Sequence, residues 1–446
     1  MNKTRFLEFV HDYILKMFTG SEIADEEPSS SRDNIVAQGE NGGVKVKFCR
    51  EDNYRVIIKR AQPFKTFEMQ LIKSIIEEMN KINESNINDD YKKGFKNLII
   101  EKAICKSLTN TSSKTLSSLL NEMNYWGQRT YEGKSTSLGF IVTTKKMGSK
   151  TNSNLHISKF LEKDFAALLT DGRGSFIEIS ADGYISNYVS YAKVVEPNLF
   201  APFRHLKLAS LATGSKIGVC LNEQGDVMIF KNRSLLFAKK SGVWICYSHE
   251  EIVGKLSEHA GEYEDVRKAI YLSALDTSFL RSGGCIVHIN SGDSFNVLKH
   301  IDEADVFYKE SFDYIQQNKN KQSFFSELDG KDDDEPSFDE FLHEDKCAKT
   351  ATLRKLIAGR KFQELDRKFR QELIAIDGAV LVDYDGKILA VGAIVKIEAG
   401  SSGGGRLAAA KTLSNYGISI KISNDGVMTG FKMDRNKLRA RAIFII

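Results

Sequence analysis

The pattern of apolar and polar positions predicts a mixture of short strands and helices from the start of the chain. Short apolar alternations over residues 44–48 and 54–59 predict two strands, and apolar positions spaced by four predict a helix over residues 66–82. An amphipathic helix is expected before them, followed by a flexible connection over residues 20–43, where polar and acidic residues dominate. These elements make a small α/β unit within residues 1–92, in which we find no candidate chemistry.

An internal repeat is the main feature of the remaining sequence. Three strand-rich pieces recur in the same order, at 138–144, 170–186 and 216–230 and again at 283–289, 376–390 and 418–431. Asp171-Gly172 matches Asp377-Gly378, Asp182-Gly183 matches Asp385-Gly386, and Gly225 matches Gly426. Chance stays an alternative, because Asp-Gly between alternating runs is a very common hairpin signal.

Helical stretches precede both copies, over residues 98–123 and 250–279, so each copy reads as an α/β sheet domain. We therefore expect tandem mixed-sheet domains over residues 97–245 and 248–446. The second carries an acidic insertion at about 302–350. The run Asp332 to Asp334 lacks the spacing of a calcium loop and predicts a solvated acidic loop.

Composition indicates a globular protein of a reducing compartment. Hydrophobic residues make up 41% and charged residues 27%, and a net charge of +4 over 446 residues is too small to indicate a nucleic-acid partner. Six scattered cysteines without metal-ligand spacing predict buried free thiols. No apolar run approaches the ~18 residues of a membrane span, and the first helix lacks a cleavage site, so we expect a cytoplasmic protein without membrane contact.

A glycine-rich loop is the best candidate for chemistry. GSSGGGR (400–406) leads into the alanine-rich helix LAAAKTL, which predicts unobstructed backbone N–H groups at a helix start, with Arg406 beside them. This combination suits a phosphate group, whereas the alternative is a flexible surface loop. Asp377 could hold a divalent ion or a ribose hydroxyl, or could simply start its strand before a tight turn. Asp385-Gly386 predicts a hairpin turn, and Met428 and Phe431 predict core packing.

These motifs resemble the diadenylate cyclase domain over about residues 266–432, without the insertion and more weakly in the first copy. That family has an Asp-Gly-Ala strand start, a Gly-Thr-Arg-His-Arg-Ala-Ala helix start and a Ser-Glu-Glu strand end. The matching positions, which the resemblance implies for nucleotide binding, are Asp377, Gly378, Ala379, Gly403, Gly404, Gly405, Arg406, Ser423 and Asp425. It also implies that Asp377 holds Mg²⁺ or Mn²⁺ with the nucleotide.

The chain departs from the family at catalytic positions. Leu407 replaces the His, Ala408 replaces the second Arg and Asn424 replaces a Glu. Such losses harm phosphoryl transfer more than binding, because catalysis needs charge stabilised in the transition state. The resemblance therefore implies a sensor that binds a nucleotide or cyclic (di)nucleotide without turnover, in bacterial signalling or defence.

Two other functions stay open. One is an active cyclase that makes cyclic di-AMP from two ATP, with Asp377 catalytic; the other is a dimerisation module that binds no nucleotide. The expected partners are a nucleotide ligand, an effector protein, and a second copy in a homo-oligomer or an intrachain pseudo-dimer. In the first copy, Arg204-His205 lies at the distance from Gly225 that Arg406 has from Gly426, to within one residue, although a surface turn is the favoured interpretation. The loop from Asp171 to Ser175 is a further candidate.

Overall fold

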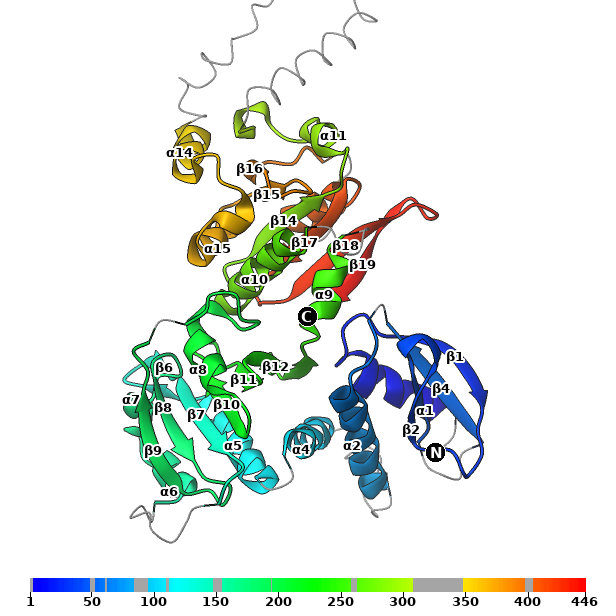
Figure 1. Cartoon of the computed structure of the whole chain (residues 1–446), viewed down its shortest axis with the longest axis vertical. Helices are drawn as coiled ribbons and strands as arrows, with labels where there is room; N and C mark the ends of the chain where they lie inside the picture. The colour runs from blue at the N-terminus through cyan, green and yellow to red at the C-terminus, as the bar shows by residue number, and fades with distance from the viewer. Residues whose placement is uncertain are drawn as a thin grey trace, which may run out of the picture. The chain divides into compact units, whose positions relative to one another are not determined.

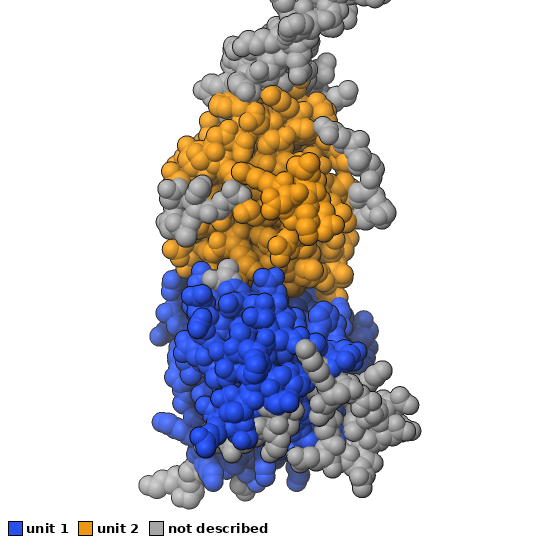
Figure 2. Space-filling model, turned by 90° about the vertical axis from the view of Figure 1, so that its right-hand side faces the viewer, with its two compact units in different colours: residues 1–249 blue, residues 250–446 orange. Residues whose placement is uncertain are grey.

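A computed structural model divides the chain into two compact units, Met1–His249 and Glu250–Ile446, coloured separately in Figure 2. The structure describes residues 3–48, 53–60, 62–83, 95–109, 112–146, 155–193, 195–257, 263–307, 348–397 and 404–446. Mixed sheets and helices alternate along both units, which confirms the predicted α/β class. Gly403 and most of the acidic insertion, including Asp332 to Asp334, lie outside the described residues.

The first unit begins with a four-stranded antiparallel sheet of order β1-β4-β3-β2 (Figure 1). Its elements are α1 (Lys3–Phe9), a π-helical turn (Val10–Leu15), β1 (Glu22–Pro28), β2 (Val36–Gln38), a short 3-10 turn (Glu40–Gly42), β3 (Val44–Val46), β4 (Tyr54–Lys59) and α2 (Thr66–Asn83). The flexible connection predicted for residues 20–43 is wrong, because β1 and β2 form the two edges of this sheet. Most of β1 is exposed, and Glu27 pairs with Lys45 and Arg55 of neighbouring strands, so an acidic composition concealed a strand.

A seven-stranded sheet completes the first unit, with order β13-β12-β11-β10-β7-β8-β9. Its strands are β7 (Leu138–Thr143), β8 (Ser175–Ile179), β9 (Ile185–Ser190), β10 (Lys216–Leu221), β11 (Val227–Lys231), β12 (Ser234–Lys240) and β13 (Val243–Cys246). Around it lie α4 (Lys96–Leu108), α5 (Ser113–Trp126), the small hairpin β5 (Thr130–Tyr131) and β6 (Lys134–Ser135), α6 (Ile157–Leu161), α7 (Ala166–Leu169), a 3-10 turn (Phe203–His205) and α8 (Leu206–Leu211). One continuous hydrophobic core joins this sheet to α2, α4, α5 and the four-stranded sheet.

The second unit has a six-stranded sheet of order β16-β15-β14-β17-β18-β19. Its strands are β14 (Gly284–Ile289), β15 (Ala379–Val382), β16 (Ile388–Ala393), β17 (Gly417–Ile422), β18 (Met428–Asp434) and β19 (Arg439–Ile445). The helices are α9 (His249–Lys255), α10 (Glu264–Leu280), α11 (Ser294–Leu298), α14 (Ala348–Ile357), α15 (Arg367–Ala375) and α16 (Gly405–Leu413), with 3-10 turns at Glu303–Asp305 and Phe362–Glu364. The side chains of β14 alternate between two layers. On one face, Cys285, Val287 and Ile289 pack with α11 and α16. On the other face, α10 and α15 pack together, and Ile374 of α15 lies against Gly284.

The second sheet repeats the topology of the first. In both, a central strand (β7 or β14) pairs in parallel with the next strand and antiparallel with a later one, and hairpins extend both sides. A register shift occurs between Ile229 and Phe230 in one sheet and between Gly430 and Phe431 in the other, which is the same place in the two ladders. All strands of the first sheet except β13 have counterparts in the same order and pairing sense in the second, and this agreement, with the shared irregularity, supports a structural repeat.

The pairing of residues between strands shows which residues of the two copies are equivalent. The turns at Gly183 and Gly386 are closed by the same pair of backbone hydrogen bonds, as are the turns at Gly225 and Gly426. The match of Asp171-Gly172 with Asp377-Gly378 is wrong in register, because Ile177 and Val380 occupy equivalent places and Asp171 lies three residues farther from its strand. The three additional residues lengthen the loop that precedes β8.

Several side chains predicted to be buried are buried. Met428 and Phe431 lie in the core, and so do the free thiols of Cys105, Cys220, Cys246 and Cys285. Both tryptophans, Trp126 and Trp244, belong to the first unit and are 2% exposed. In the part of the chain that the structure describes, no helix combines the length and the apolar character needed to cross a membrane.

Candidate functional site

The topology of the second unit gathers the predicted loops at one end of its sheet. Because β14 and β15 run parallel, Gly283 and Asp377, which precede them, start at the same end. The antiparallel strand β17 finishes there, pairing Ile422 with Gly284, and the turn that contains Asn424 follows it. Helix α16 brings Arg406 to the same corner, where it contacts both Asn424 and Asp377.

Arg406 is the central cation of this corner. Its Nη1 donates to Asn424 Oδ1 at 3.0 Å, and its Nη2 lies 3.7 Å from Asp377 Oδ1. The Asp377 side chain is 97% exposed, so solvent screens this ion pair and Asn424 is the contact that orients the guanidinium. The Nε of Arg406 is buried and has no hydrogen-bond partner among the described residues.

Two glycines make room for this arrangement. At Gly283, whose φ is +70°, an added Cβ would lie 2.5 Å from Arg406 Nη1 and 2.3 Å from Asn424 Oδ1, so any side chain would displace both groups. At Gly378, whose φ is +105°, a Cβ would lie 2.4 Å from the carbonyl carbon of Gly392. The positions of Arg406 and Asp377 therefore depend on glycine at 283 and 378.

The start of α16 is open on its outer side. Gly404 caps the helix with a φ of +83°, and an added Cβ on Gly404 or Gly405 would meet no described atom within 4 Å. Two N–H groups of the first turn, those of Leu407 and Ala408, donate to the Gly404 carbonyl, and those of Gly405 and Arg406 precede them at the end of this nine-residue helix that carries its partial positive charge. Gly404 and Gly405 thus leave space for an anion beside Arg406.

Three further predicted residues, Ala379, Ser423 and Asp425, have local contacts in the structure, and their binding role stays a prediction. Ala379 is buried in β15, Ser423 Oγ accepts from Lys421 Nζ at 2.6 Å, and Asp425 Oδ1 accepts from the backbone N–H of Val427 at 3.1 Å. Sequence reasoning did not include Asn424 or Gly283 among the site residues. The only sequence signal for Asn424 was its place in the Ser-Glu-Glu position, and for Gly283 the pair Gly283-Gly284 before a strand.

The metal proposal has limited support at Asp377. Among the described residues, no group of three or more histidine, cysteine, aspartate or glutamate side chains is placed to hold a metal ion. Mg²⁺ is usually held by one or two carboxylates together with substrate phosphates. Asp377 therefore fits an ion only as one ligand beside a bound phosphate.

The equivalent corner of the first unit is filled by its own residues. Glu223 occupies the hairpin position of Asn424, and its carboxylate lies 2.8 Å from Arg173 Nη2 and 3.8 Å from Arg204 Nη1. Arg204 therefore makes the contact that corresponds to Arg406 with Asn424. It lies in a 3-10 turn with a side chain that is 48% exposed, as the surface-turn interpretation predicted.

The loop before β8 likewise satisfies its own donors. Asp171 Oδ1 accepts from the backbone N–H groups of Arg173, Gly174 and Ser175 at 2.8–2.9 Å. Although burial opposes it, hydrogen bonding by these N–H groups lowers the pKa of Asp171 to about 2. The carboxylate already occupies the place that a phosphate would take, so the second unit has the more open corner.

Comparison with known proteins adds no family to this description. The chain matches no protein-family model, no curated protein and no solved structure. The resemblance to the diadenylate cyclase domain therefore depends on the quoted motifs, and the nucleotide, cofactor and partner predictions depend on it in turn.

Proposed function

We propose that the second unit binds the phosphate group of a nucleotide or cyclic (di)nucleotide at the corner formed by Gly283, Asp377, Gly404, Gly405 and Arg406, and that the protein acts as a sensor. The observation that carries the proposal is the guanidinium of Arg406, held by Asn424 over Gly283 beside the open start of α16. Backbone N–H groups at a helix start and an arginine are the usual partners of phosphate.

Binding without turnover follows from the residues around Arg406. The positions that follow it are Leu407 and Ala408, which offer no charge to a transferring phosphoryl group, and Asn424 cannot supply a carboxylate for a metal. Burial raises the pKa of the nearby Cys285 thiol to about 12, against the opposing charge of Arg406, so no thiolate nucleophile is present there.

The test is ligand binding by the full chain and by an Arg406→Ala variant. We expect calorimetry with ATP, AMP, GTP and cyclic di-AMP to identify a ligand that the variant binds at least about tenfold more weakly, because a charged hydrogen bond contributes ~1.5–3 kcal/mol. Arg204→Ala is the matched control, since Arg204 holds the equivalent position in the first unit, and it should leave the affinity unchanged.

Two results would contradict the proposal. One is an Arg406→Ala variant with the affinity of the unaltered protein. The other is a full chain that shows neither binding nor thermal stabilisation with any nucleotide in the panel. Formation of cyclic di-AMP from ATP with Mg²⁺ or Mn²⁺, lost in Asp377→Asn, would instead establish the active cyclase.

A further inference from the structure

The hairpin of β18 and β19 is longer than its counterpart in the repeat. The pair Lys231 and Ser234 in the first sheet is equivalent to the pair Lys432 and Arg441 in the second. In the first sheet the chain turns at once, through two residues with left-handed φ values. In the second it makes two more pairs, Met433 with Ala440 and Asp434 with Arg439, before it turns. Residues 433–440 therefore form an extension that the repeated fold does not require.

This extension, together with the pair Lys432 and Arg441 at its base, carries a formal net charge equal to that of the whole protein. We call residues 432–441 the basic hairpin; its cations are Lys432, Arg435, Lys437, Arg439 and Arg441, and its single carboxylate is Asp434. Its formal net charge of +4 equals that of the entire chain, so the other residues are balanced. The net charge of +4 is small for a chain of 446 residues, but the ten residues of the basic hairpin carry the same net charge.

The charges of the basic hairpin lie on both of its strands and in its turn. Lys432 and Arg441 are directly opposite each other. Asp434 lies opposite Arg439 and accepts from the backbone N–H groups of Asn436 and Lys437, which secures the turn. Residues 435–439 are exposed, and Leu438 at the tip is 80% exposed, so the core gains little from them.

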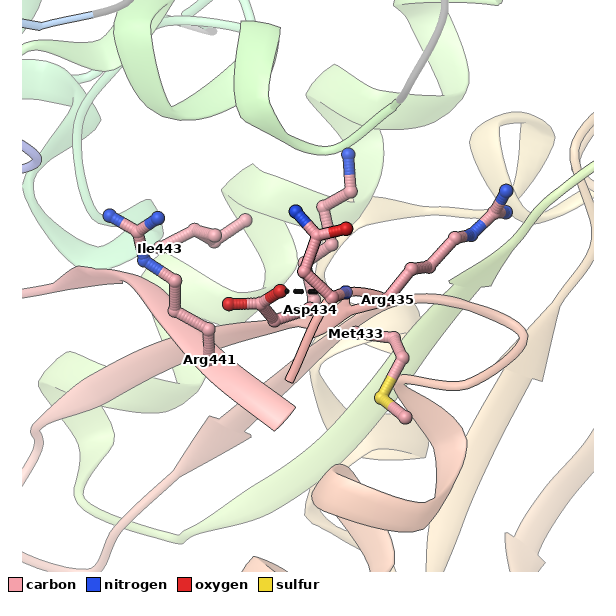
Figure 3. A pocket seen from close by; sticks show the side chains of 7 residues that line it. Met433, Asp434, Arg435, Arg441 and Ile443 are labelled. Carbon is pink, nitrogen blue, oxygen red and sulfur yellow. Dashed lines mark hydrogen bonds between the residues drawn. The ribbon is translucent and has the colours of Figure 1, made fainter. Parts of the chain in front are cut away.

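The surface of the basic hairpin is hollowed (Figure 3). A cavity of about 470 Å³ is lined by Lys432, Met433, Asp434, Arg435, Asn436, Arg441 and Ile443. Figure 3 shows Asp434 between Arg441 and Arg435, whose side chains point away from each other. The volume lies within the roughly 300–1,000 Å³ of ordinary ligand clefts, although here the lining is cationic and belongs to one protruding ribbon.

We propose that the basic hairpin binds the phosphate backbone of nucleic acid. A two-stranded ribbon fits the major groove of duplex DNA, and the ribbon here carries cations on both strands and in its turn. Arginine, which provides three of the five cations, pairs with phosphate through two parallel hydrogen bonds. An extended array of charges suits a polyanion better than a single small anion, because each phosphate contact adds to the affinity.

This proposal departs from the expectation of no nucleic-acid partner. That expectation used the net charge of the whole chain, whereas binding depends on how charge is distributed over the surface. An anionic membrane is the weaker candidate, since membrane-surface segments combine cations with a broad apolar face, and among exposed residues 435–439 only Leu438 is apolar.

The test compares two variants that lose the same charge. The first combines Arg435→Gln, Lys437→Gln and Arg439→Gln, and the second combines Lys134→Gln, Lys146→Gln and Lys163→Gln at exposed positions of the first unit. Fluorescence anisotropy with labelled 30-base-pair DNA and RNA duplexes measures binding by the full chain between 50 and 200 mM salt. Thermal unfolding of each variant verifies that it is folded.

We expect the hairpin variant to bind at least about tenfold more weakly than the unaltered chain, with a log–log salt slope smaller by about 2–3, since each phosphate contact contributes about 0.9. The lysine variant should bind within about twofold of the unaltered chain. No binding of either duplex at 50 mM salt, or an equal loss in both variants, would overturn the proposal.

Two further arms separate other partners that a cationic ribbon could bind. One uses a synthetic peptide of residues 327–345, a segment with ten carboxylates and one lysine, and the other uses vesicles that contain anionic lipid. Binding of the peptide or the vesicles that requires the hairpin cations, without binding of a duplex, would replace nucleic acid as the partner and overturn the proposal.

Discussion

Asp383 and Asp385 share the turn between β15 and β16 and ionise very differently. Burial, together with the neighbouring Asp385 carboxylate, raises the pKa of Asp383 to about 7. Asp385 shares a hydrogen bond with Asp383 and pairs with Lys361 at 2.8 Å, and its pKa is lowered to about 2. A protonated Asp383 that donates to an ionised Asp385 is the stable form of the turn.

The two carboxyl groups therefore give stability opposite dependences on pH. The raised pKa of Asp383 makes its contribution complete below about pH 4 and lost as pH rises toward 7, because the unfolded chain ionises this carboxyl group in that range whereas the folded state keeps it protonated. Asp385 has a lowered pKa, so its carboxylate stabilises the folded state above about pH 4, and this stabilisation is lost as the pH falls toward 2.

Asp383→Asn should remove the loss between pH 4 and 7, because the amide donates to Asp385 at every pH. At pH 8 we expect this variant to be more stable than the unaltered protein by about 1 kcal/mol, the usual net contribution of one hydrogen bond. Urea denaturation between pH 3 and pH 8 measures the effect. Asp385→Asn is the comparison and should flatten the curve below pH 4 instead; an unchanged slope in Asp383→Asn would refute the assignment.

At the same scale, sequence reasoning found the residues that carry recognisable motifs. Asp377, Gly378 and Arg406 do meet at one corner, because their spacing around strands and a helix start constrains where they lie. Asn424 and Gly283 were not predicted from the sequence, because their roles come from contacts between segments far apart along the chain. Nucleotide binding by Ser423 and Asp425 stays a prediction; each makes one local hydrogen bond in the structure.

Between elements, one buried ion pair ties α10 to α15. Arg367 Nε lies 2.7 Å from Asp276 Oδ2, its Nη2 donates to Asp276 Oδ1 at 2.9 Å, and the two side chains are 1% and 2% exposed. Burial, together with the charge of Arg367, lowers the pKa of the adjacent Arg370 to about 10, so Asp276 balances two buried guanidinium groups. Asp276 is therefore the member of the cluster whose loss is least tolerable.

Asp276→Asn should destabilise the second unit by about 3–5 kcal/mol, the range for breaking a buried ion pair. Adding Arg367→Met should restore part of this loss, because it removes one of the uncompensated cations. Far-ultraviolet circular dichroism in urea measures the single and double variants. A double variant less stable than Asp276→Asn would show that Arg367 stabilises the helices by packing and not by charge.

Element prediction succeeded where apolar residues were periodic and failed where they were absent. Strands β7, β10, β14 and β17 are almost fully buried; the first three have nearly continuous apolar runs, and β17 alternates isoleucine with polar residues. Strand β1 is an exposed edge, held by backbone pairing with β4 and by ion pairs, so its sequence carried no alternation. The helix predicted over residues 98–123 is two helices, α4 and α5, which share the core but are separated at Thr109.

For the whole molecule, the repeat was readable from sequence because hairpin turns leave a fixed mark. Gly183 with Gly386, and Gly225 with Gly426, adopt positive φ in turns of identical hydrogen bonding, so glycine persists at these points in both copies. The β18–β19 extension left no such mark, since its length is apparent only when the two ladders are compared residue by residue. The small net charge of the whole chain also gave no indication of this basic extension.

The distribution of chromophores and thiols makes the two halves of the protein separately observable. Trp126 and Trp244 both belong to the first unit, so tryptophan emission, excited beyond the absorption band of tyrosine, reports on that unit, whereas the second contains Cys285 as a buried thiol. Burial suppresses its thiolate, and alkylation must wait for the chain around it to open. In urea, Asp276→Asn should lower the urea concentration at which Cys285 becomes alkylated, as measured by peptide mass spectrometry. The midpoint of the emission transition should not change. A shift of both midpoints together would mean that the two units unfold as one cooperative body.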